Sequence, residues 1–137
     1  MNDTPLDDDA QLSGLDLQPT IDRLLQAERA LSRYLDTETR VEVAQQVGRT
    51  QARLRSLAGT LVVQQIDLVA NDAGITAQHI NDASAYALRV IERIAGWKAR
   101  VKKLGALIEF LGVVMTGHGG HILQAAIRLR RELDAAT

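Results

Sequence analysis

The sequence predicts an all-α fold, and three observations support this class. Apolar residues make up 46% of the 137 residues but aromatic residues only 3%, so the core must be built from aliphatic side chains. Ala, Leu, Arg and Gln, which favour helices, are frequent, and the chain has only two prolines. Apolar side chains also recur about every 3.5 residues over long stretches, which is typical of helices packed along a seam.

The chain divides into a flexible acidic arm, expected over residues 1–18, and a single helical domain over 19–137. The arm contains Asp3 and the run 7–9, and it has no Lys or Arg. Basic residues gather later, between 89 and 103. Two interpretations stay open: the arm is a solvated tail, or it folds against the basic residues of its own chain.

The first two helices are predicted from their apolar spacing and their end signals. Pro19 suits the first turn of a helix that ends near Asp36. Thr37 is then expected to cap a second helix over about 38–70. In the link that follows, Gly74 suits a left-handed turn and Thr76 an N-cap, so the next helix should return antiparallel to the second.

The third helix is predicted from two seam positions that are apolar throughout. One position holds Ile80, Ala87, Ile94, Val101 and Ile108, and the other holds Ala83, Val90, Trp97, Leu104 and Leu111. This pattern predicts one continuous helix of about 50 Å. With the second helix it would form a long, coiled-coil-like antiparallel hairpin, flanked by shorter helices near 19–36 and 121–133. Two short helices cannot cover so long a pair, so we expect a second copy to complete the bundle.

The seam predicts the function expected here, a non-enzymatic helical module that self-associates and binds a protein partner. The predicted interface consists of Val47, Leu54, Leu61, Ile80, Ile94, Trp97, Val101, Leu104, Ile108 and Leu111. The identity of the partner and the stoichiometry of the oligomer do not follow from the pattern.

The segment 104–116 supports an alternative function, because it is apolar on every side except at Glu109. It would be buried against protein or inserted into lipid, as part of a membrane-active protein that inserts 104–127. The lipid contacts would then be Leu107, Phe110, Val113, Val114 and Met115. Burial is the preferred interpretation, since the segment is shorter than the ~20 residues that span a bilayer and a central carboxylate costs about 2.5–3.5 kcal/mol.

We expect neither catalytic activity nor metal binding, although a small metal-binding or enzymatic bundle stays a second alternative. His118 and His121 stand in a Gly-rich turn, but a metal site would need further ligands. We therefore predict no catalytic residue, no metal and no cofactor. A net charge of -1 and no cysteine argue against nucleic-acid binding and disulfides. The acidic start lacks the features of a secretory signal, so a cytoplasmic location is expected.

Overall fold

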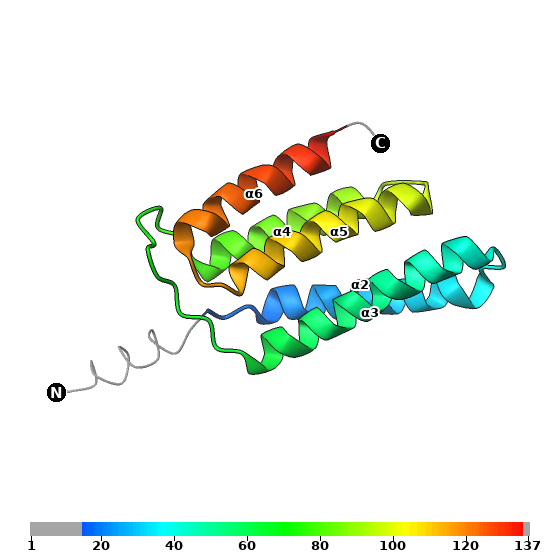
Figure 1. Cartoon of the computed structure of the whole chain (residues 1–137), viewed down its shortest axis with the longest axis horizontal. Coiled ribbons are helices and arrows are strands. Elements are labelled where there is room, and N and C mark those ends of the chain that lie inside the picture. The colour runs from blue at the N-terminus through cyan, green and yellow to red at the C-terminus, as the bar shows by residue number, and fades with distance from the viewer. Residues whose placement is uncertain (1–14, 136–137) are drawn as a thin grey trace.

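The computed structural model describes residues 15–135, which form five α-helices and no extended strand (Figure 1). The predicted all-α class is therefore confirmed. The helices are α2 (Gln18–Thr37), α3 (Val41–Val63), α4 (Ala77–Glu92), α5 (Trp97–Val114) and α6 (Gly119–Asp134). Of the predicted arm, residues 1–14 lie outside the described residues.

The helices are arranged in three layers (Figure 1). The hairpin of α2 and α3 forms one layer, α4 and α5 form the middle layer, and α6 forms the third. Helix α2 packs on α4 and α3 packs on α5, while α6 contacts both helices of the middle layer. The core lies between these layers, where Leu24, Leu54, Leu107 and Leu111 are completely buried.

The predicted third helix is wrong, because the chain reverses over residues 93–96. Helix α4 ends at Glu92 and α5 begins at Trp97, with Gly96 as its N-cap. The guanidinium of Arg100 donates hydrogen bonds to the backbone oxygens of Ile94 and, at 2.7 Å, of Glu92. It thereby satisfies carbonyl groups that the end of α4 leaves without helical partners.

This break replaces the predicted long hairpin with two shorter ones, α2–α3 and α4–α5. The apolar repeat continues through the reversal because each of the two helices turns its own stripe toward the core. The length argument for a second copy no longer holds, since no 50 Å helix pair has to be covered.

The second helix is also shorter than predicted. Helix α3 ends at Val63, and Thr37 is the last residue of α2 rather than a cap. The chain from 64 to 76 leaves the helix and lies against the turn between α5 and α6. Val69 donates its N–H to Gly117 O at 2.7 Å and accepts from Gly119 N at 2.9 Å. These tertiary hydrogen bonds take the place of further helical ones.

Several end signals are confirmed. Pro19 lies in the first turn of α2. Gly74 has a φ of +69°. Thr76 is the N-cap of α4, and its hydroxyl accepts from the N–H of His79 at 3.3 Å. The imidazole Nδ1 of His79 accepts the N–H of Thr76 at 3.1 Å, which completes a reciprocal capping box.

Two charged side chains are buried between helices, and both have partners. Lys103, on α5, is 2% exposed and donates to the backbone oxygens of Glu132 and, at 3.2 Å, of Ala135 at the end of α6. Its ammonium also lies 3.9 Å from the Glu132 carboxylate. Glu28, on α2, is 7% exposed and accepts from side chains of α3. These contacts fix the outer helices against their neighbours.

Candidate functional site

A groove of about 580 Å³ lies between α2, α4 and the beginning of α5. We call it the α2–α4–α5 groove. Its floor is apolar and consists of Ala27, Ala30, Leu31, Ala85, Leu88, Ile91 and Leu104. Alanines on both α2 and α4 leave space between the helices that larger side chains would fill. The groove follows the direction of α2 and α4, which run parallel to one another.

The rim of the groove is basic. Arg23 and Arg33 from α2, Arg89 from α4 and Arg100 from α5 line it, and Glu92 is the single acid among the described residues that do so. Arg33 and Arg89 are exposed and make no hydrogen bond or ion pair with any residue from 15 to 135. Their charges are therefore available to a ligand, whereas Arg100 binds the backbone oxygens of Glu92 and Ile94.

Trp97 closes one end of the groove. Its ring lies 3.8 Å from that of Tyr34, measured between centroids, with a tilt of 33°. The guanidinium carbon of Arg100 lies 4.9 Å from the centre of the Trp97 ring, within the range of a cation–π contact. Trp97 is also the one tryptophan of the chain, so its fluorescence reports on this groove alone.

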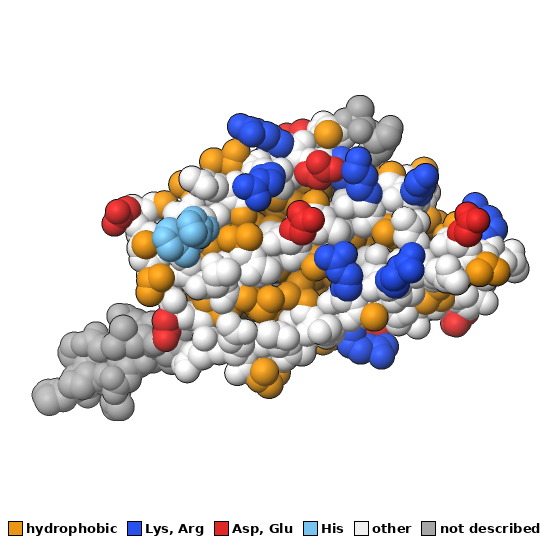
Figure 2. All heavy atoms as spheres, in the orientation of Figure 1, with side chains coloured by type: hydrophobic (Ala, Val, Ile, Leu, Met, Phe, Trp, Pro, Cys, Tyr) orange, Lys and Arg blue, Asp and Glu red, His pale blue; other side chains and the backbone are white. Residues whose placement is uncertain are grey.

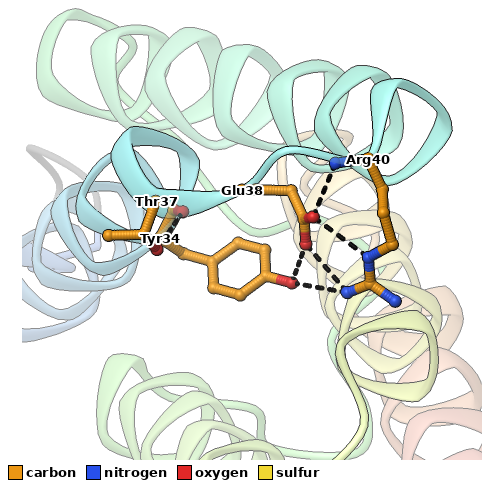
Figure 3. Close-up of polar contacts among 4 residues, drawn as sticks. All are labelled: Tyr34, Thr37, Glu38 and Arg40. Carbon is orange, nitrogen blue, oxygen red and sulfur yellow. Dashed lines mark hydrogen bonds and ion pairs between the residues drawn. The ribbon is translucent and has the colours of Figure 1, made fainter.

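Tyr34 is itself held by the turn between α2 and α3 (Figure 3). Its hydroxyl donates to the carboxylate of Glu38 and accepts from Arg40 at 3.2 Å. Arg40 also binds both oxygens of Glu38, at 2.8 and 3.0 Å. The Arg40 guanidinium keeps the pKa of the Glu38 carboxyl far below its usual value, and donation to that carboxylate raises the pKa of Tyr34. The network positions the ring that supports Trp97.

A second groove, of about 340 Å³, lies between α5 and α6. Lys102 and Arg128 line it together with Glu109 and Glu132, so its charges balance. Basic and acidic side chains are intermixed on the face of the molecule that Figure 2 shows. This balance gives the second groove less selectivity for a charged ligand than the α2–α4–α5 groove has.

Most of the predicted interface lies inside one copy of the chain. Seven of its residues are buried in the core, namely Val47, Leu54, Leu61, Ile80, Val101, Leu104 and Leu111. Ile94, Trp97 and Ile108 are half-buried. The seam therefore packs against other helices of its own chain, and only Trp97 and Leu104 among these residues line the α2–α4–α5 groove.

The residues predicted to contact lipid belong to the middle layer. Leu107, Phe110 and Val114 are buried, and Val113 and Met115 are half-buried. Inserting them into a bilayer would require α5 to leave the core. Among the helices of the described residues, none combines the length and the apolar character needed to cross a membrane.

The two histidines of the Gly-rich turn stack on one another, with ring centroids 3.7 Å apart (pale blue in Figure 2). Nδ1 of His118 accepts the N–H of His121 at 3.1 Å, so His118 acts as the N-cap of α6. Residues 15–135 contain no group of three or more His, Asp or Glu side chains placed to hold a metal ion. The imidazole of His118 therefore has a structural role, as the cap of α6.

Sequence reasoning found part of the groove. Arg89 and Arg100 belong to the basic stretch noted between 89 and 103, and Trp97 was a predicted contact residue. Arg23 and Arg33 were missed, because they approach the others only through the packing of α2 on α4. Their signal in the sequence is slight: two arginines on the face of α2 that also carries small alanines.

Comparison with known proteins adds no assignment: no family model, no curated protein and no solved structure matches this chain.

Proposed function

We propose that this protein is a non-enzymatic helical interaction module whose α2–α4–α5 groove binds an acidic amphipathic helix of a protein partner. The observation that carries the proposal is the combination of an apolar floor with a rim of four arginines, opposed by Glu92 alone. An amphipathic helix presents both complementary features, since one face is apolar and its flanks can be acidic.

The two parts of the groove have different roles in binding. Each Leu-sized side chain that the floor removes from water contributes about 1.5–3 kcal/mol. Arg33 and Arg89 would pair with carboxylates on the flanks of the helix, and guanidinium groups bind carboxylates through two hydrogen bonds. Exposed ion pairs of this kind add more to the association rate and to selectivity than to affinity.

Self-association through the heptad seam is not part of the proposal. Seven residues of that seam are already buried within one chain. A second copy could reach them only by displacing helices of the first.

The test uses a designed helical peptide as the probe, about 14 residues long so that it spans roughly 21 Å. Leucines at positions i, i+4, i+7 and i+11 form its apolar ridge, and glutamates flank the ridge. A matched peptide carries lysines in place of the glutamates. Binding is followed by the emission of Trp97. We expect the acidic peptide to bind and the basic one to bind at least about tenfold more weakly, a difference of ~1.4 kcal/mol.

Protein variants locate the binding site. The double variant Arg33→Gln, Arg89→Gln should bind the acidic peptide more weakly than the wild type does. Arg53→Gln should bind it as the wild type does, because Arg53 is an exposed residue of α3 outside the groove. Two results would show that the groove is not the binding site: equal affinity of the wild type for the acidic and the basic peptide, or an equal loss of affinity in the double variant and in Arg53→Gln.

A further inference from the structure

We infer that residues 1–14 of the chain itself occupy the α2–α4–α5 groove when no partner is bound, so that a partner must displace them. The inference rests on the proposed function, since it assigns a competitor to the same groove. Three observations support it: the charge of the segment, the point where it joins the folded domain, and its length.

The segment has the composition that the groove selects. It carries Asp3 and the run 7–9, and it contains no Lys or Arg. Leu6, Ala10 and Leu12 supply apolar side chains for the floor. The same segment is acidic enough to pair with Arg33 and Arg89, which have no partner among the described residues.

The segment joins the domain beside one end of the groove. The backbone oxygen of Asp16 accepts a hydrogen bond from the side-chain amide of Asn81 on α4, at 3.0 Å. Asn81 is followed on the same face of α4 by Ala85, Leu88 and Glu92, all of which line the groove. Leu17 is buried and holds this junction in place. Asp16 therefore lies about one helical turn from the groove, and the preceding Leu15 donates its N–H to Ile66 O, in the loop after α3, at 3.1 Å.

The segment is long enough to cover the groove. From Asn81 to Glu92, α4 rises by roughly 16 Å. Fourteen residues span roughly 46 Å when extended and roughly 21 Å as a helix. The chain has to reverse direction before α2, because α2 runs along the groove away from this end. In the sequence, Ser13 and Gly14 come directly before the described residues, and both residue types are common in turns.

Attachment makes a weak contact effective. A short tether gives an effective concentration on the order of 1 mM. A segment with an intrinsic dissociation constant of about 0.1 mM would then occupy about nine tenths of the grooves and lower the apparent affinity of a competing ligand about tenfold. Neutralising the segment should remove this competition. Raising the salt to ~1 M should also remove it, since the screening length then falls to ~3 Å.

The first experiment measures proximity in the full chain. The chain has no cysteine, so Thr4→Cys provides a single attachment point for a nitroxide label. We expect the label to broaden the indole N–H signal of Trp97 at low salt and to lose this effect at high salt. Arg33→Gln combined with Arg89→Gln should abolish the broadening, while the control Arg53→Gln should retain it. An unbroadened Trp97 signal at low salt would overturn the inference.

A mixed sample distinguishes the same chain from a second copy. Isotope-labelled chain without nitroxide is combined with nitroxide-carrying chain that has no isotope label. If the Trp97 signal is broadened in this mixture as much as in the chain that itself carries the nitroxide, docking within one chain is overturned. An unaffected Trp97 signal in the mixture supports it.

The second experiment separates this inference from the proposed function. The acidic helical peptide is titrated into the wild type and into the variant Asp7→Asn, Asp8→Asn, Asp9→Asn. We expect the variant to bind the peptide about tenfold more tightly, from the competition estimated above. Equal binding to both proteins would overturn the inference and leave the proposed function standing. Failure of the peptide to bind either protein would overturn the proposed function.

Discussion

Gly119 provides a sharp test of how the loop 64–76 is held against the start of α6. An ideal Cβ at this position would lie 2.4 Å from Oδ1 and 2.7 Å from Cα of Asn71. Asn71 has little freedom to retreat, because Oδ1 accepts the N–H of Ile75 at 2.8 Å and Nδ2 donates to the Ile75 oxygen at 2.9 Å. Gly119→Ala therefore forces a side chain into occupied space.

The magnitude follows from three opposing contributions. Overpacking costs about 1–3 kcal/mol. Displacing Asn71 loses two hydrogen bonds, each contributing about 0.5–1.5 kcal/mol. Alanine returns at most about 1 kcal/mol through its higher helix propensity. We expect a net loss of about 1–6 kcal/mol in the free energy of unfolding, and a fall in Tm of roughly 3–5 °C for each kcal/mol.

The assay is urea unfolding followed by circular dichroism, with Gly59→Ala as the matched control. Gly59 is an exposed helical residue about one turn before the end of α3, and an added Cβ would meet nothing within 4 Å. The same chemical change should stabilise the protein there by about 0.5–1 kcal/mol. If Gly119→Ala matches or exceeds the wild type while Gly59→Ala gains stability as expected, the close approach of the loop to α6 is refuted.

Three further predictions concern the core and its buried charges. Leu111→Ala should cost about 2–5 kcal/mol of unfolding free energy and leave the mass measured by light scattering unchanged, because Leu111 packs within its own chain. Lys103→Met leaves the last carbonyls of α6 without their donor, so amide exchange should accelerate in its final turn; unchanged exchange would contradict the capping role. Hydrogen bonds from Gln51 and Arg55 lower the pKa of Glu28 below 4.5, so the unfolded chain binds more protons in acid. The wild type should therefore lose stability relative to Glu28→Gln as the pH falls below about 4.5; parallel pH profiles in urea would rule this out.

The sequence predicts the helix class and several helix ends, because these depend on local interactions. Pro19 and Thr76 act within one turn of their own positions, and their roles can be read without knowing the fold. The repeat from Ile80 to Leu111 predicts which side chains are buried for the same reason. Periodicity reports that a face meets a core, and five of the ten residues of this repeat are buried while the other five are half-buried.

The same repeat could not reveal the reversal at 93–96. Gly96 is the local signal, but one glycine inside a helical pattern is often tolerated. The reversal also depends on Arg100, whose guanidinium satisfies carbonyls of the preceding helix. Similarly, α3 ends at Val63, and the loop that follows brings Val69 to the turn at Gly117. The groove is harder still to predict, since Arg33 and Arg89 meet only after α2 has packed on α4.

The buried ammonium of Lys103 depends on acceptors that are synthesised after it. Lys103 leaves the ribosome 29 residues ahead of Glu132, whose backbone carbonyl oxygen accepts a hydrogen bond from that ammonium. At ~5–20 residues per second this interval lasts roughly 1.5–6 s. During that time α5 carries an unpaired charge on the side that will face α6, and burying such a charge is costly. The ammonium of Lys103 is therefore expected to stay in solvent until the last helix has been made, since only the end of α6 provides its hydrogen-bond acceptors.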